Sequence, residues 1–301
     1  MLFFLHIPKT AGSTFRSIAR RYFQPEQIMD RRALLLYCRA HGIPDSDRHR
    51  IPFETALEWL SPEIKSGVKC LYAHMRYGMH QFFPGHGNYL TILREPVARF
   101  ISGYYYVLRQ QSNPLHEAVK CKRIEDFFEL DTLRGFGTEF DLSKRNLQTR
   151  MISGISDPDN PEILSVAKER LREDFSYFGI SELFDESLVG FSQSPIGRHL
   201  AWPVLYYTPR NVGSNYKRDI PLPPNFVETV KERNKLDIAL YEYALDLFKK
   251  NISKIPDFDA KLQRFKNLNL RYQRLNRFLS GKMLIGKDLA ALAEKALVMC
   301  A

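Results

Sequence analysis

Residues 3–14 have the sequence Phe-Phe-Leu-His-Ile-Pro-Lys-Thr-Ala-Gly-Ser-Thr, an apolar run that passes into a short polar segment with one lysine. The apolar run predicts a buried β-strand. Apolar residues then recur at helical spacing, at Phe15, Ile18, Ala19, Tyr22 and Phe23, which predicts an amphipathic helix. A strand, a tight loop and a helix commonly bind phosphate, because loop amides and the positive helix end point toward the anion. The stretch therefore predicts a nucleotide-like anion held against Lys9.

The composition is that of a globular protein with an anionic ligand. The chain has 301 residues, 44% of them apolar, and a formal charge of +10, which favours partners such as nucleotides, nucleic acid or anionic surfaces. Its four cysteines are scattered, which argues against a disulfide framework or a thiolate metal site. The first predicted strand follows Met1 almost at once, and no apolar run is long enough to span a membrane. We therefore expect a cytoplasmic protein.

Strand-like and helix-like segments alternate along the rest of the chain. Further strands are predicted at 68–73, 89–93 and 177–180, and further helices at 96–108, 162–174 and 225–250. This alternation predicts an α/β fold with a P-loop-like central parallel sheet flanked by helices. We interpret 1–255 as the main domain, 256–301 as a basic helical extension, and 24–66 and 111–145 as insertions that cover the site.

Three chemically active side chains each follow a predicted strand. Lys9, His74 and Arg94 lie just past the first, second and third apolar runs, and ligands bind at the carboxyl ends of parallel strands. We therefore expect two cations and a base at one edge of the sheet, with Ser102 free to add a hydrogen bond. The alternatives are that Thr10 or Ser13 caps the helix, and that Arg94 and Ser102 are solvated surface residues.

Two segments resemble the donor-binding motifs of sulfotransferases, which use 3′-phosphoadenosine 5′-phosphosulfate (PAPS). They are HIPKTAGST at 6–14 and LREPVARFISGYYY at 93–106. The resemblance implies that Arg94 and Ser102 bind the 3′-phosphate of the donor. It also implies that the 5′-phosphosulfate is bound by Lys9, Thr10, Ala11, Gly12, Ser13 and Thr14.

Later segments resemble the heparan sulfate 2-O- and 6-O-sulfotransferases and their bacterial relatives. They are NLQTRM at 146–151, YFGISE at 177–182 and NKLDIALYEYA at 234–244. This resemblance implies a catalytic histidine in AHMRY at 73–77, which is His74, with His80 and His86 as nearby competitors. It further implies a donor-closing loop in which Ser214, Asn215, Lys217 or Arg218 takes part. We expect Gln148 and Arg150 to face the donor or the acceptor as substrate-binding residues. The alternative for all of these is a solvated loop.

The resulting hypothesis is in-line transfer of a sulfuryl group from PAPS to a hydroxyl of a glycan. His74 would accept the proton of the acceptor, and Lys9 would stabilise the leaving oxygen. No acidic cluster suggests a metal ion, so we expect transfer without one and no nucleic-acid partner. Two rivals stay open: a nucleotide-dependent phosphotransferase that needs Mg²⁺, and a non-catalytic anion or nucleic-acid binder.

The segment 261–287 contains eight lysines and arginines and no acidic residue, with apolar residues at helical spacing. It predicts a basic amphipathic helix. This helix could dock on the domain with its charges in water, lie on an anionic membrane surface, or bind the acceptor or a partner.

Overall fold

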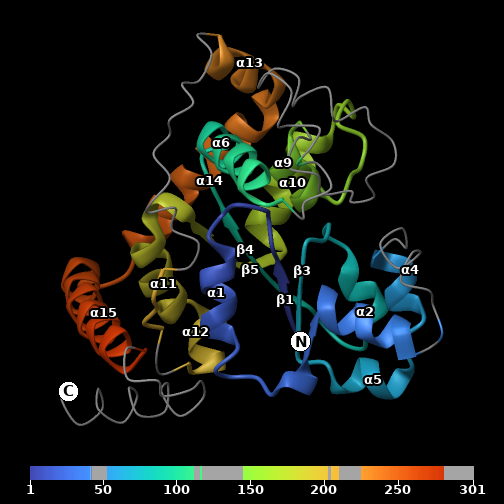
Figure 1. Cartoon of the computed structure of the whole chain (residues 1–301). Coiled ribbons are helices and arrows are strands. Elements are labelled where there is room, and N and C mark those ends of the chain that lie inside the picture. Colours follow the sequence, from blue (N-terminus) through green and yellow to red (C-terminus); the bar gives the residue numbers. More distant parts are fainter. Residues whose placement is uncertain are drawn as a thin grey trace.

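A computed structural model describes residues 1–40, 42, 53–111, 116, 145–202, 205–209 and 225–280. Its middle layer is a five-stranded sheet in the order β2-β3-β1-β4-β5, with every neighbouring pair parallel (Figure 1). The strands are β1 (Leu2–Leu5), β2 (Ile28–Asp30), β3 (Cys70–Ala73), β4 (Asn88–Leu93) and β5 (Phe175–Ile180). The predicted parallel α/β sheet is confirmed, whereas the division at residue 255 stays a prediction.

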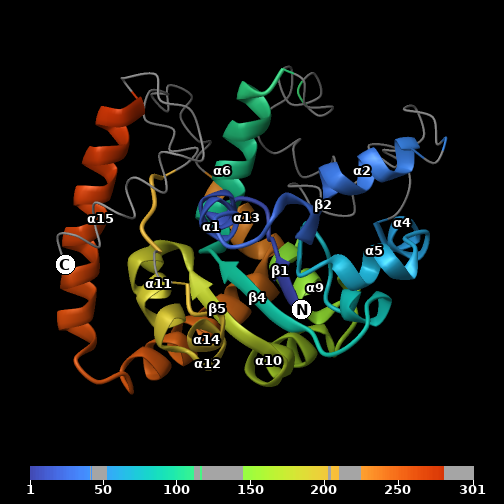
Figure 2. The same cartoon turned by 90° about the horizontal axis from the view of Figure 1, so that it is seen from below.

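Helices cover both faces of this sheet. They are α1 (Gly12–Ala19), α2 (Arg31–Ala40), α4 (Phe53–Glu58), α5 (Pro62–Gly67), α6 (Pro96–Arg109), α9 (Leu147–Ser153), α10 (Ile163–Glu173), α11 (Phe184–Gln193), α12 (Pro195–Leu200), α13 (Phe226–Arg233), α14 (Lys235–Ile252) and α15 (Phe258–Ser280), with 3-10 turns at Pro25–Gln27, Met79–Phe82 and Ser181–Leu183. The group formed by α2, α4 and α5 lies on the opposite side of the molecule from α15 (Figure 2).

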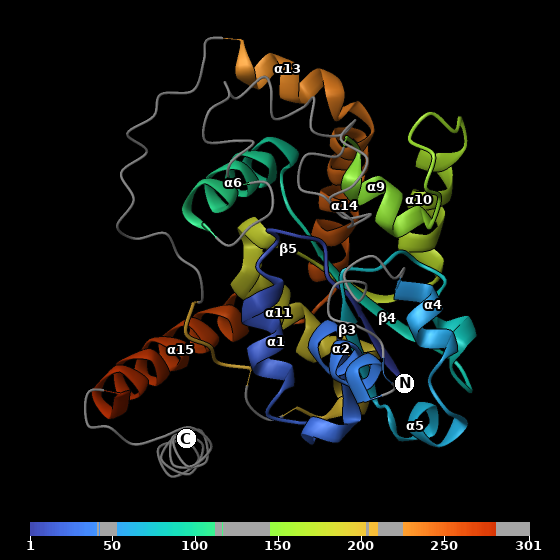
Figure 3. The same cartoon turned by 45° about the vertical axis from the view of Figure 1, so that its right-hand side comes forward.

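Strand β1 is buried on both faces, as a central parallel strand requires. Phe3 and Leu5 belong to a core shared with α2, α4, α9, α10 and α14. Leu2 and Phe4 point the other way, into a core shared with α1, α11, α12 and α15. A third apolar cluster joins α6 to α13; both helices lie in the upper part of Figure 3. The unbroken apolar run of the first strand thus reflects two buried faces.

The order of the strands places a ligand edge beside β1. From β1 the chain first builds β2 and β3 on one side, and then β4 and β5 on the other. Leu5 pairs with Ala73 and with Thr91, so the ends of β1, β3 and β4 are nearly level. In parallel sheets, ligands bind at the carboxyl edge where the strand order reverses. That edge here is the end of β1.

Two boundaries differ from the sequence prediction. Interpreting 24–66 as a covering insertion is wrong for Ile28–Asp30, which form the edge strand β2; three residues between polar segments are too short a run to recognise. The helix predicted at 225–250 is two helices, because the chain breaks at Asn234. Nearly all of the segment 111–145 lies outside the described residues.

The basic helix α15 is docked on the domain. Phe265, Asn269 and Tyr272 are buried against it, and Lys266 forms an ion pair with Glu186 at 3.1 Å. The opposite side of the helix exposes Arg264, Arg271, Arg274 and Arg277. For 261–280 the docked amphipathic helix is therefore confirmed, and 281–287 lie outside the described residues.

No helix in the described part of the chain combines the length and the apolar character needed to cross a bilayer. Contact of 261–287 with a membrane surface and a cytoplasmic location stay predictions.

Helices α9 and α14 cap each other at their amino ends. The Asn146 side chain accepts hydrogen bonds from the main-chain N–H groups of Leu236 and Asp237, at 3.2 and 3.4 Å. In return, the Asp237 carboxylate accepts the main-chain N–H groups of Gln148 and Thr149, at 3.1 and 2.8 Å. The amino end of a helix otherwise leaves these donors unpaired, so this exchange locks α9 against α14.

Asp237 also compensates a buried cation. The side chain of Arg99 is fully buried, and its three nitrogen atoms have no hydrogen-bond partner among the described residues. Burial lowers the pKa of Arg99, and the nearby Asp237 carboxylate opposes that shift. Asp237 is also fully buried, so both side chains lie in the protein interior.

Replacing Asp237 with alanine should therefore destabilise the protein strongly. The substitution leaves the amides of α9 unpaired and the charge of Arg99 without compensation, and breaking such a buried pair costs about 3–5 kcal/mol. Urea unfolding measures the loss. The control is Asp246→Ala, an exposed aspartate on the same helix, which should change the free energy of unfolding by less than about 0.5 kcal/mol. Equal losses in the two variants would contradict the role of Asp237.

Candidate functional site

The carboxyl edge of the sheet brings Lys9, His74 and Arg94 together. Arg94 Nη1 donates a hydrogen bond to the Lys9 carbonyl oxygen at 2.9 Å. His74 Nδ1 lies 2.6 Å from the carbonyl oxygen of His6. These two contacts tie the segments after β3 and β4 to the loop between β1 and α1. Two cations and an imidazole thus meet around a single loop.

The loop after β1 exposes the amino end of α1. Lys9 and Ala11 adopt left-handed backbone conformations, with φ of 70° and 65°. Ala11 occupies the N-cap position and no side chain caps the helix, so helix capping by Thr10 or Ser13 is wrong. The Thr10 hydroxyl instead donates to the Ile7 carbonyl oxygen at 2.9 Å. Uncapped amides at a helix start are an anion-binding arrangement.

Gly12 lets this helix start approach His6. A Cβ atom on Gly12 would lie 2.0 Å from Cδ2 of His6, well inside van der Waals contact. The His6 ring also lies 2.8 Å, through Nδ1, from the Tyr72 hydroxyl. Burial first, and then the neighbouring His74, lower the pKa of His6 well below its ordinary value. His6 is therefore a neutral, packed residue that supports the edge.

Lys9 sits in an electropositive environment. Its ammonium group lies 4.3 Å from the centre of the Tyr106 ring. Burial, with the added repulsion of Arg109 and Arg94, lowers the pKa of Lys9 to about 8. Ser102, Tyr106 and Arg109 are spaced to share one face of α6. Sequence reasoning identified Ser102 but missed Tyr106 and Arg109, which the same spacing could have indicated.

The side chain of Gln148 holds the backbone of Arg94 in place. Its N–H donates to Gln148 Oε1 at 3.0 Å, and its carbonyl oxygen accepts from Gln148 Nε2 at 2.8 Å. Its guanidinium also lies 3.8 Å from Glu182. Gln148 is fully buried, and its main-chain N–H donates to Asp237. Gln148 therefore connects the contact between α9 and α14 directly to the backbone of Arg94.

Further residues were predicted to contact the donor or the acceptor. The substrate-binding roles of Gln148 and Arg150 stay predictions; Arg150 Nε donates to the Ser156 carbonyl oxygen at 2.9 Å. Ser13 and Ser102 are half-buried, and Thr14 is buried. Ser214, Lys217 and Arg218 lie outside the described residues.

The geometry of His74 determines which nitrogen is basic. A carbonyl oxygen can only accept, so Nδ1 carries the proton in the contact with His6, and Nε2 keeps its lone pair. The ring stacks on His6 at a centroid distance of 4.4 Å and is exposed to solvent. Dense surrounding protein still lowers the pKa of His74 through desolvation, against the hydrogen bond to His6, and Arg31 and Arg16 lower it further. A neutral imidazole with a free Nε2 is a competent proton acceptor.

The two competing histidines lie toward the other end of the sheet. His80 Nδ1 is 3.1 Å from the hydroxyl of Tyr89, which pairs with Phe3 near the start of β1. The carbonyl oxygen of His86 accepts a bond from the amino group of Met1 at 3.3 Å. Neither contact is at the carboxyl edge, so the geometry favours His74.

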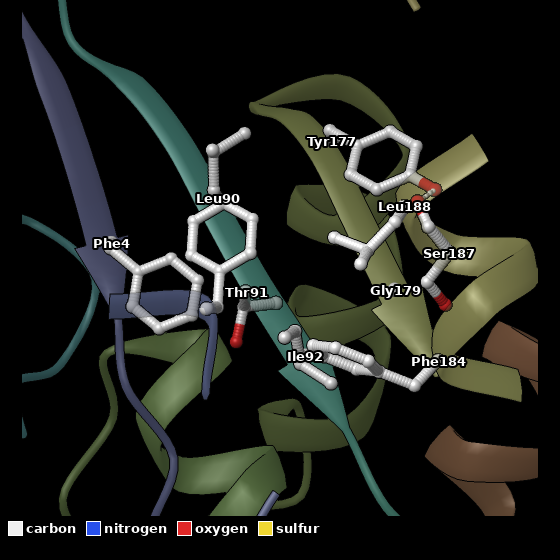
Figure 4. A pocket seen from close by; sticks show the side chains of 10 residues that line it. Phe4, Leu90, Thr91, Ile92, Tyr177, Gly179, Phe184, Ser187 and Leu188 are labelled. Carbon is white, nitrogen blue, oxygen red and sulfur yellow. Dashed lines mark hydrogen bonds between the residues drawn. The ribbon is translucent and has the colours of Figure 1, made fainter. Parts of the chain in front are cut away.

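A small pocket lies between the sheet, α1 and α11 (Figure 4). Its lining is mostly apolar, and its polar atoms are already used. The Thr91 hydroxyl donates to Leu5, and the Ser187 hydroxyl accepts from Ile180. Lys9, His74 and Arg94 do not line it, so it belongs to the core beneath the edge.

The described ranges contain no group of three or more histidine, cysteine, aspartate or glutamate side chains that could hold a metal ion.

Comparison with known proteins gives a consistent result. The model of the sulfotransferase family matches residues 1–244. The chain is 24% identical to heparan-sulfate 6-O-sulfotransferase 2 of Gallus gallus, covering 82% of this chain and 66% of that protein. It is 26% identical to galactose-3-O-sulfotransferase 3 of Homo sapiens, covering 83% of this chain and 57% of that protein. The chain thus spans less than two thirds of the length of these relatives.

The electropositive setting of Lys9 has a measurable consequence. Lys9 should titrate at about pH 8. The Arg109→Gln substitution should raise that midpoint, because it removes a positive charge that disfavours the protonated amine. NMR of ¹³C-methylated lysines, with the Lys9 signal assigned from Lys9→Arg, measures the shift. Arg271→Gln, an exposed arginine on α15, is the control. An unchanged midpoint in Arg109→Gln would exclude this explanation.

Proposed function

The chain belongs to the sulfotransferase family, and we propose that it transfers a sulfuryl group from PAPS to a hydroxyl of a glycan. One observation carries the proposal. Lys9, Arg94 and the uncapped start of α1 converge at one part of the edge, and His74 is bound through Nδ1 to His6 of the same loop, which leaves Nε2 to accept a proton. The relatives named above are sulfotransferases of heparan sulfate and of galactose, which supports a glycan acceptor.

The donor would be held at its two charged ends. Lys9 and the amides of Gly12 and Ser13 would bind the 5′-phosphosulfate, since a helix start and a cation both favour an anion. Arg94 would bind the 3′-phosphate, with Ser102 adding a hydrogen bond. Burial and the repulsion of Arg109 and Arg94 lower the pKa of Lys9. The repulsive part supports this assignment, because a bound anion would relieve it.

The transfer would then proceed in line. The acceptor hydroxyl gives its proton to His74 Nε2, and its oxygen forms a bond to sulfur. The bond between sulfur and the bridging oxygen breaks, and negative charge collects on the departing adenosine 3′,5′-bisphosphate. Lys9 is placed to stabilise that charge, which is the role that preorganised cations serve in catalysis. We propose that these side chains do so without a metal ion.

The primary test is donor binding followed by turnover. Adenosine 3′,5′-bisphosphate at a hundredfold excess over its Kd should stabilise the protein by about 2.7 kcal/mol, and ATP with Mg²⁺ should stabilise it less. The shift should fall in Arg94→Gln and persist in Arg172→Gln, an exposed arginine of α10. Mass spectrometry of a glycan panel incubated with PAPS and a chelator then detects the sulfuryl mass gain. Preferential stabilisation by ATP with Mg²⁺ would favour a phosphotransferase instead.

The role of His74 has its own test. His74→Ala should lower kcat by a factor of about 10²–10⁴, the usual contribution of a general base. Stabilisation by adenosine 3′,5′-bisphosphate should persist, because His74 lies outside the donor contacts. His86→Ala is the matched control, since its side chain is exposed near the opposite edge. A kcat close to that of wild type in His74→Ala would remove the residue from this role.

A further inference from the structure

Helix α15 has an outward face that the proposed reaction does not use. Its inner side is fixed to the domain, because Phe265 belongs to the core shared with α1, α11 and α12. The buried Tyr272 also accepts a hydrogen bond at its hydroxyl from Arg21 at 3.0 Å. The helix lies at the margin of the molecule, on the side away from α2, α4 and α5 (Figure 2). Its outer side is therefore a surface that is already formed in the folded protein.

The positive charge of this outer side is not neutralised by the protein. The exposed arginines of α15 are Arg264, Arg271, Arg274 and Arg277. No ion pair or hydrogen bond within the described part of the chain involves any of them. Lys266, by contrast, pairs with Glu186 of α11 at 3.1 Å. The sequence from 261 to 280 contains no acidic residue, so the outer face carries four positive charges and favours a partner with several negative ones.

Two large apolar side chains are exposed among these arginines. Leu270 is 52% exposed and Phe278 is 59% exposed. At 3.6 residues per turn, Leu270 projects between Arg274 and Arg277 around the helix axis, and Phe278 projects between Arg271 and Arg274. A single exposed apolar residue is common, but here both lie within one basic face. Basic and apolar side chains together match the two layers of an anionic membrane surface, the charged headgroups and the apolar boundary beneath them.

We propose that the outer face of α15 docks the protein on a bilayer surface that contains anionic lipids. The arginines contact the headgroup phosphates, with which a planar guanidinium forms paired hydrogen bonds. Leu270 and Phe278 insert between the headgroups. An acidic glycan or a nucleic-acid backbone would match the charge of the arginines alone, whereas a bilayer also accepts the two apolar side chains. The proposal does not depend on the proposed sulfuryl transfer.

Vesicle flotation of the full chain tests this surface. The vesicles consist of phosphatidylcholine alone or of phosphatidylcholine mixed with phosphatidylglycerol. Wild type should float with the anionic vesicles and not with the neutral ones, and high salt should weaken the binding by screening. Combining Arg271→Gln with Arg274→Gln should lower the partition coefficient by about fivefold for each arginine, or about 25-fold for both. Combining Leu270→Ser with Phe278→Ser keeps the charge and should lower it by about tenfold or more.

The matched control combines Arg32→Gln with Arg39→Gln. Both arginines are exposed on α2, on the opposite side of the molecule from α15 (Figure 2), so the net charge falls by the same amount. This control should float as wild type does. Every substituted side chain is exposed, so all the variants should keep the Tm of wild type.

Three results would overturn the proposal. The first is equal flotation of wild type with neutral and anionic vesicles, or none with either. The second is an equal effect of the arginine substitutions on α15 and on α2, because net charge alone would then explain the binding. The third is a loss with the arginine substitutions on α15 but none with Leu270→Ser and Phe278→Ser. That pattern indicates a surface for a soluble polyanion, without insertion into a bilayer.

Discussion

The contact between His6 and Gly12 is the constraint on which the candidate site depends. His6 donates its main-chain N–H to Ala73 and accepts His74 Nδ1 at its carbonyl oxygen, so it orients the base. Its ring packs where a Cβ atom of residue 12 would otherwise lie, so it also sets the approach of α1. One residue thus positions both the imidazole and the helix start that we propose binds the donor. A side chain at position 12 would disturb both at once.

A buried polar network holds the part of the site around Arg94 in place. Asp237 holds the amino end of α9, and Gln148 of that helix binds the main chain of Arg94 on both sides. In an interior of low dielectric constant, such bonds are strong when complete and costly when one partner is missing. The network ties segments almost ninety residues apart, and so couples the stability of the fold to the orientation of one guanidinium.

Positive charge is concentrated at the same edge. Burial is the main cause of the lowered pKa of Lys9, and repulsion by Arg109 and Arg94 adds to it. Burial also lowers the pKa of His74, and Arg31 and Arg16 lower it further. Binding of the proposed anionic donor would relieve the repulsion around Lys9, and this links the electrostatics of the free protein to the sulfuryl transfer proposed for it.

Local patterns were sufficient for the parallel sheet, the tight loop between β1 and α1, and the convergence of Lys9, His74 and Arg94. Apolar runs identify strands, and topology rules place the residues that follow them at one edge. Edge strand β2 was missed because three residues carry too little periodicity. The contact of Lys9 with Tyr106 and the Gln148 bonds to Arg94 depend on contacts between distant segments. Local sequence encodes which backbone forms, whereas packing sets which side chains meet and which charges stay uncompensated.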